Sequence, residues 1–268
     1  MRRSRLVGFL TSVLLAAGAA LTGAATAQAS PTAVTGGYVA LGDSYSSGVG
    51  AGSYIGSSGD CKRSTKAYPY LWAASNSPSS FDFTACSGAR TGDVLAGQLG
   101  PLSSSTGLVS ISIGGNDAGF ADVMTTCVLQ SDSSCLSRVA TARAYVDQTL
   151  PGNLDSVYSA IRTKAPNAHV VVIGYPRFYK LGTSCIGLSE TKRKAINDAS
   201  DLLNTTIAKR AADHGFTFGD VRPPFTGHEI CSGSAWLHSV NWLNIGESYH
   251  PTAGGQSGGY LPVLNSAA

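Results

Sequence analysis

The chain reads GYVALGDSY over residues 37–45, an apolar run that stops at a small polar turn. Residues 38–41 favour a β-strand, and Gly42 and Asp43 end the run just before Ser44. Open α/β sheets place their chemistry at the carboxyl ends of buried parallel strands. This stretch therefore predicts an α/β fold that presents Ser44 as a candidate nucleophile.

Three other segments extend the pattern. The strand-like residues 81–85 run into a turn that contains Gly88, and the apolar residues 108–113 end in a Gly-Gly-Asn-Asp turn that contains Asn116. Far along the chain, His250 precedes a proline. A serine and a distant histidine suggest a nucleophile and its base, although each turn taken alone is also typical of an ordinary loop.

Strand-like and helix-like patterns alternate along the chain, which predicts βαβ units and a parallel sheet covered on both faces. In such a sheet, Ser44, Gly88, Asn116 and His250 converge at one edge. The expected strands are 38–41, 81–85, 108–113, 169–173 and 216–221, and the expected helices are 68–75, 93–99, 118–129, 136–164 with an interruption at Pro151, 189–214 and 252–261.

These motifs together resemble the Ser, Gly, Asn and His blocks of the SGNH or GDS(L) hydrolases. The similarity runs from about residue 38 to residue 264, and three longer strings look like the secreted streptomycete-type lipases of that family. The resemblance implies a three-layer α/β/α flavodoxin-like fold with a five-stranded parallel sheet. The motifs are Gly42-Asp43-Ser44, Gly88, Gly115-Asn116-Asp117 and His250-Pro251, and the strings are 41–54, 85–93 and 113–120.

The resemblance also implies an extracellular lipase or esterase that needs no cofactor or metal. Ser44 is expected to form the acyl-enzyme and His250 to act as the base. Ser44 and Gly88, through their backbone N–H groups, and Asn116, through its side-chain amide, are expected to form the oxyanion hole. The expected substrates are acylglycerols and fatty acyl esters. The alternatives are a carbohydrate acetylesterase, a phospholipase, or an exported binding protein without activity.

The group that orients His250 is left open by the sequence. The family usually has an aspartate three residues before the histidine, and here that position is Glu247. The backbone carbonyl of Ser248 is the other candidate, because an Nδ1–H donor needs only a fixed acceptor. We favour a Ser-His dyad with this carbonyl, and an acid limb of activity near the ordinary histidine pKa of about 6.5.

The first 29 residues read as a signal peptide, with three arginines, an apolar stretch to Ala25 and the cleavage signal Ala27-Gln28-Ala29. A rival site is 25–27, and a membrane anchor is disfavoured because no stop-transfer pattern follows. We expect residues 30–268 to form a single secreted domain, monomeric and without stable membrane insertion.

The charge balance argues against nucleic acid as a partner. Removing the three arginines of the signal peptide from the 19 basic residues leaves 16, which equals the 16 acidic residues. No basic face for tracking phosphates is indicated. The cluster Lys192-Arg193-Lys194 is interpreted as a solvated helix face.

Six cysteines in an exported chain favour disulfides over metal sites. Six cysteines allow 15 pairings. Pairing in sequence order closes the shortest loops, and the family resemblance implies the same pattern. The expected bridges are Cys61 to Cys86, Cys127 to Cys135 and Cys185 to Cys231.

Overall fold

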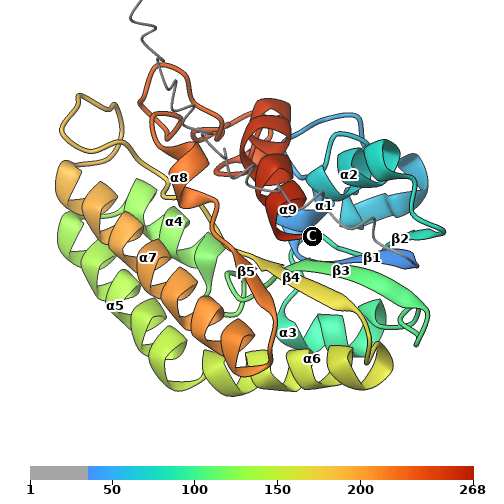
Figure 1. Cartoon of the computed structure of the whole chain (residues 1–268). Helices are drawn as coiled ribbons and strands as arrows, with labels where there is room; N and C mark the ends of the chain where they lie inside the picture. Colours follow the sequence, from blue (N-terminus) through green and yellow to red (C-terminus); the bar gives the residue numbers. More distant parts are fainter. Residues whose placement is uncertain (1–35) are drawn as a thin grey trace, which may run out of the picture. The chain divides into compact units, whose positions relative to one another are not determined.

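A single five-stranded sheet, all parallel, organises the protein (Figure 1). The computed structural model describes residues 36–268, so the predicted signal peptide lies outside the described residues. The strand order β2-β1-β3-β4-β5 is the flavodoxin-like order, which confirms the predicted fold class. The strands are β1 (Gly37–Gly42), β2 (Phe81–Phe83), β3 (Thr106–Ser112), β4 (His169–Ile173) and β5 (Thr217–Gly219).

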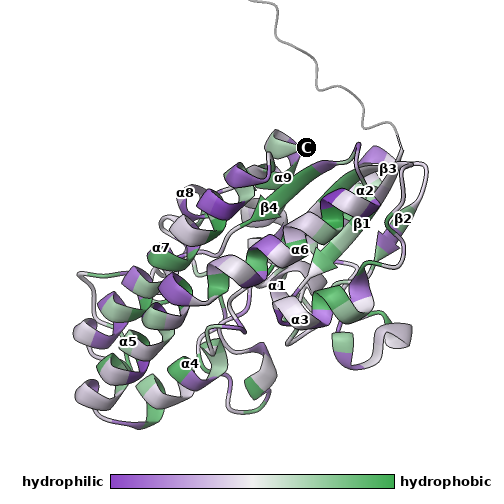
Figure 2. Cartoon of the chain, turned by 90° about the horizontal axis from the view of Figure 1, so that it is seen from below, coloured by the Kyte–Doolittle hydropathy of each residue, from purple (hydrophilic) through white to green (hydrophobic). Residues whose placement is uncertain are grey.

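The central strands are buried on both faces. Every residue of β1 is buried, and so are the last four residues of β4. Strands covered on both sides read as continuous apolar runs, which explains why their sequences show no alternation. In Figure 2 these strands carry the hydrophobic colour, while the helices around them mix hydrophobic and hydrophilic residues.

Helices cover both faces of the sheet, as a three-layer fold requires (Figure 1). One face carries α1 (Ser44–Ser47), α2 (Tyr68–Asn76) and α9 (Leu261–Ala267). The other carries α3 (Thr91–Asp93), α4 (Phe120–Leu129), α5 (Asp132–Gln148), α6 (Leu150–Lys164) and α7 (Glu190–Asp213). The remaining short elements are α8 (Arg222–Phe225) and the helical turns η1 (Gly56–Cys61), η2 (Val94–Gln98), η3 (Ile245–Glu247) and η4 (Gly255–Tyr260).

The structure corrects several predicted boundaries. The long helix predicted at 136–164 begins earlier and divides into α5 and α6, and Pro151 lies in the first turn of α6, where a missing N–H costs nothing. The last helix continues beyond residue 261 to Ala267. The outer strands β2 and β5 are shorter than predicted, because each has a pairing partner on one side only.

Two of the three residues in the basic cluster at the start of α7 do not lie on the solvated face that the charge pattern predicted, while Lys194 does. The Lys192 and Arg193 side chains are buried. The Lys192 ammonium donates to the carbonyls of Cys127 and Gln130 at 2.9 and 2.6 Å, at the end of α4, where free carbonyls favour a cation. Arg193 donates to the carbonyl of Lys180 at 2.7 Å. Both residues therefore fix neighbouring backbone.

The six cysteines form three disulfides, in the pairs that the family resemblance implies: Cys61 with Cys86, Cys127 with Cys135 and Cys185 with Cys231. The second cysteine of the first bridge, Cys86, lies two residues before Gly88. Between them, Ser87 N–H donates to the Cys61 carbonyl at 3.1 Å. This bridge therefore fixes the turn that carries Gly88.

Candidate active site

The site lies where the sheet reverses its strand order. The chain leaves β1 towards α1 on one face, and it leaves the neighbouring strand β3 towards α4 on the other. In open α/β sheets a crevice forms at this point, beyond the carboxyl ends of the strands. Ser44 follows β1 and Asn116 follows β3, so the topology brings both residues to this crevice.

A tight turn presents Ser44 at the start of α1. Gly42 has φ +120°, and a Cβ at this position would lie 2.4 Å from the carbonyl oxygen of Ser112. Only glycine fits both the conformation and the space. The Asp43 carboxylate then caps α1 by accepting from Tyr45 N–H at 3.0 Å.

Ser44 and His250 are hydrogen-bonded although 206 residues separate them. The Ser44 Oγ lies 2.7 Å from His250 Nε2, and His250 Nδ1 lies 3.0 Å from the carbonyl oxygen of Ser248. A carbonyl only accepts, so Nδ1 carries the proton and Nε2 is left to accept from the serine hydroxyl. This is the geometry of a nucleophile and its general base.

Glu247 points to a different partner. Its Oε1 accepts from the Tyr54 hydroxyl at 2.7 Å, and that hydroxyl in turn accepts from Gly50 N–H at 2.9 Å. The acceptor at His250 Nδ1 is the Ser248 carbonyl. The arrangement is that of the dyad, with the glutamate joining two loops beside it.

Two further donors face the crevice. Gly88 has φ +78°, a left-handed conformation that favours glycine, and nothing lies within 4 Å of the place a Cβ would occupy. The Asn116 side-chain amide donates one hydrogen to the Ala89 carbonyl at 3.0 Å. That bond fixes the amide plane and leaves its second hydrogen for another acceptor.

Asp117 ties together the two turns that carry these donors. Its carboxylate accepts from Thr91 N–H at 3.1 Å and from the Thr91 hydroxyl at 2.5 Å. The turn after β3 is thereby held against the segment that follows Gly88. Asp117 therefore has a structural role beside the site.

A buried hydrogen-bond network supports the nucleophile turn. Asp43 accepts from the Ser112 hydroxyl at 2.8 Å and from the Tyr175 hydroxyl at 2.5 Å. Burial raises the pKa of Asp43 to about 6, although these hydrogen bonds oppose the rise. Tyr175 also accepts from Gly115 N–H at 3.3 Å, so one phenol connects the turn after β1 with the turn after β3.

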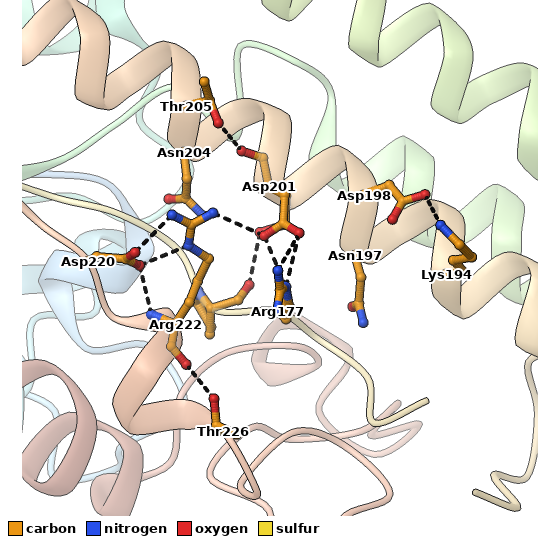
Figure 3. Close-up of polar contacts among 12 residues, drawn as sticks. Arg177, Lys194, Asn197, Asp198, Asp201, Asn204, Thr205, Asp220, Arg222 and Thr226 are labelled. Atoms are coloured by element: carbon orange, nitrogen blue, oxygen red, sulfur yellow. Dashed lines mark hydrogen bonds and ion pairs between the residues drawn. The ribbon is translucent and has the colours of Figure 1, made fainter. Parts of the chain in front are cut away.

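One face of α7 holds Tyr175 in place. Asn204 bonds both backbone groups of Tyr175, with its Oδ1 accepting and its Nδ2 donating, each at 2.8 Å. One turn before Asn204, Asp201 binds Arg177 and Arg222 (Figure 3). A further turn before Asp201, Asn197 lies on the same face of the helix. The loop after β4 is thus anchored at several points, which fixes the phenol below Asp43.

Burial also changes the pKa of His250. The pKa of His250 is lowered to about 4, mainly because burial disfavours the imidazolium, and the hydrogen bond to Ser248 offsets only part of this effect. Among residues 36–268, no carboxylate accepts from the ring. This pKa lies below the value near 6.5 on which the sequence-based expectation rested, because burial outweighs the hydrogen bond.

Two residues near His250 support the site without having been predicted from the sequence. His238 N–H donates to the His250 carbonyl at 3.0 Å, and the His238 ring bonds the Gly50 carbonyl at 2.8 Å. Gln256 donates to the Tyr45 carbonyl at 3.0 Å and accepts from Tyr68 N–H at 2.9 Å. No local pattern marks either residue, because the partners of their side chains lie about 190 to 210 residues away.

Ser44 and Asn116 line two neighbouring pockets. The first, here called the catalytic groove, has a volume of about 470 Å³ and is open to solvent beside His250 and Gly88. The second, the inner cavity, has a volume of about 70 Å³ and runs between α4, α5 and α7. Asp43 and Arg143 are the charged residues among those that line it, and most of the others are apolar. A carbonyl carbon at Ser44 would therefore have an apolar cavity on one side and solvent on the other.

A parallel sheet with a hydrogen-bonded serine and histidine at its carboxyl edge has the arrangement of an α/β serine hydrolase. The chain belongs to the GDSL-like Lipase/Acylhydrolase family, whose model matches residues 40–257, and the family resemblance of the sequence is thereby confirmed.

Relatives of known name agree with this assignment. The chain is 85% identical to Lipase 1 of Streptomyces coelicolor over the full length of both proteins. Two crystal structures cover 87% of this chain and all of their own. Phospholipase A1 of Streptomyces albidoflavus NA297 has 71% identity and a TM-score of 0.86, and the extracellular lipase of Streptomyces rimosus has 69% identity and a TM-score of 0.85.

Proposed function

We propose that the protein is a secreted carboxylic ester hydrolase that acts on acyl esters of lipids through Ser44. The single observation that carries this proposal is the 2.7 Å hydrogen bond between Ser44 Oγ and His250 Nε2 at the mouth of an apolar cavity. Membership of a lipase and acylhydrolase family supports the same reaction class.

In the proposed mechanism, Ser44 Oγ attacks the carbonyl carbon while its proton moves to His250 Nε2. The Ser248 carbonyl holds Nδ1–H and so stabilises the imidazolium that forms. The imidazolium then gives its proton to the leaving alcohol, and Ser44 is acylated. A water molecule reverses these steps, releasing the acid and restoring the serine.

The negative charge on the carbonyl oxygen needs donors that are fixed before the reaction. We assign this role to the backbone N–H groups of Ser44 and Gly88 and to the amide of Asn116. The Cys61–Cys86 bridge and the Asn116 bond to Ala89 fix two of them, so little reorganisation is needed when charge develops.

The apolar lining of the inner cavity suits the part of the acyl group that lies next to the ester carbonyl. Val123, Val146 and Leu203 line the cavity, from three different helices, and apolar walls contribute binding in proportion to the methylenes that they bury. The glycerol or headgroup part of the ester would occupy the catalytic groove. The relative named phospholipase A1 makes phospholipids a second substrate class for the same site.

The domain boundary and the location are proposed from the sequence. Residues 1–29 are a signal peptide, residues 30–268 are the mature domain, and the Streptomyces rimosus relative is named an extracellular lipase. Within residues 36–268, no helix is both long enough and apolar enough to cross a membrane.

The test is a panel of soluble esters from acetyl to long acyl, an emulsified triacylglycerol and a phosphatidylcholine, each assayed with wild-type protein and Ser44→Ala. Wild type should prefer medium or long acyl groups, and Ser44→Ala should lose turnover while keeping its melting temperature. A preference for acetyl esters would favour the acetylesterase alternative. Turnover above a tenth of wild type in Ser44→Ala would refute the nucleophile, and no turnover of any ester by wild type would favour the binding protein.

A further inference from the structure

An exposed loop beside the catalytic groove carries large apolar side chains. This segment, here called the rim loop, covers residues 240–247. Within residues 36–268, five large apolar side chains are more than 60% exposed, and three of them are Trp242, Leu243 and Ile245. A fourth, Leu129 at the end of α4, lines the same groove. Exposed apolar surface is therefore concentrated at the entrance to the groove.

The rim loop is a folded structure with its own polar contacts. Asn241 Oδ1 accepts from the N–H groups of Leu243 and Asn244 at 3.2 and 3.1 Å, and the Ser248 hydroxyl accepts from Asn241 N–H at 2.8 Å. Glu247 also accepts a hydrogen bond from the Tyr54 hydroxyl. Several backbone groups of the loop are thus hydrogen-bonded within it, while Leu243, 101% exposed, projects into solvent.

We propose that the rim loop docks the protein on the surface of its lipid substrate by inserting Trp242, Leu243 and Ile245 among the lipid chains. This inference rests on the proposed function and names the physical state of the substrate, an aggregated lipid. Clusters of exposed apolar residues beside a binding groove mark interaction surfaces, and tryptophan in particular prefers the boundary between lipid and water.

The placement of these residues argues for lipid over a protein partner. Trp242 and Ile245 are exposed and also line the catalytic groove, so one apolar surface continues from solvent to Ser44. A lipid chain that leaves the aggregate along this surface stays in apolar surroundings. Nearby, the Lys62 ammonium lies 3.5 Å from the place that a Cβ on Gly246 would occupy, where it would meet headgroup phosphates.

Binding to vesicles separates docking from catalysis. Ser44→Ala protein, which leaves the lipid intact, is mixed with phosphatidylcholine vesicles, and bound protein is measured by flotation and by tryptophan fluorescence. Trp72 is buried and Trp236 is partly buried, so Trp242 is the most exposed of the three tryptophans. Its emission should shift to shorter wavelength on vesicles, and Trp242→Phe should lack most of this shift.

The decisive variant is Leu243→Ser, made in both the wild-type and the Ser44→Ala protein. It should weaken vesicle binding by roughly tenfold, the effect of leaving one large apolar side chain in water. Turnover of a soluble short-chain ester should stay as in wild type, which shows that the fold and the site are intact. Leu136→Ser is the matched control, because Leu136 is 40% exposed and lines a separate groove between α5 and α7.

Three results would overturn the proposal. The first is unchanged vesicle binding in Leu243→Ser, and the second is an equal loss in Leu136→Ser. The third is a wild-type dimer in sedimentation that Leu243→Ser dissociates, because the rim loop would then pair with a second copy of the chain. Failure of the proposed function has a different signature, the loss of turnover on soluble esters, which docking does not affect.

Discussion

Replacing Glu247 by alanine tests how the base is oriented. In the structure Glu247 accepts one hydrogen bond from Tyr54 at 2.7 Å, while the Ser248 carbonyl lies 3.0 Å from His250 Nδ1. Glu247→Ala therefore removes one exposed bond, worth about 0.5–1.5 kcal/mol of unfolding free energy. It leaves the acceptor of the imidazole untouched, so turnover should stay within about tenfold of wild type.

A carboxylate that orients the base would give a very different result. Its removal costs about 10⁴-fold in turnover, or roughly 5 kcal/mol of transition-state stabilisation. The assay is kcat/KM on a soluble chromogenic ester together with a melting curve. Tyr54→Phe is the matched control, because it deletes the same hydrogen bond from the other side. A loss above about a thousandfold in folded Glu247→Ala, without a similar loss in Tyr54→Phe, would refute the dyad.

Three further predictions concern the base, the oxyanion hole and the inner cavity. His250 must be neutral to accept a proton, and burial lowers its pKa to about 4, so its protonation should make kcat/KM on a soluble ester fall with a midpoint near pH 4. Any step near pH 6 belongs to Asp43, whose pKa burial raises to about 6. An NMR titration of the His250 imidazole with a midpoint near 6.5 would contradict the burial of the ring. Asn116→Ala should lower kcat by roughly 100- to 1000-fold, and a loss under about threefold would leave Asn116 only a turn residue. Arg143 lines both the inner cavity and a separate groove between α5 and α7, so Arg143→Ala should join the two. The variant should raise kcat/KM for longer acyl esters by about fourfold per added methylene. An unchanged dependence of kcat/KM on acyl chain length would contradict this.

The fold and the meeting of Ser44, Asn116 and His250 at one site were predictable because their signals are local. The strand before Ser44, the strand before Asn116 and the proline after His250 are each contained in a few consecutive residues. The alternation of strands and helices then fixes the edge at which they meet. A parallel sheet with short connections leaves few other topologies.

The supporting contacts were not predictable, because they join residues far apart in the sequence. Tyr175 reaches Asp43 over 132 positions, and His238 reaches Gly50 over 188. The charge pattern around Lys192 indicated a solvated face, and only the packing of α7 against the end of α4 shows that its ammonium is buried on two carbonyls. The pKa of His250 likewise depends on burial, which no single segment determines.

The segment that carries His250 lies 206 positions after Ser44, and this order sets when the proposed site can form. Near His250, Gln256 bridges the backbones of Tyr45 and Tyr68. A chain still being synthesised has its serine turn long before it has an imidazole to accept the proton. The proposed site therefore assembles only after the segment with His250 has been made and has packed against the serine turn.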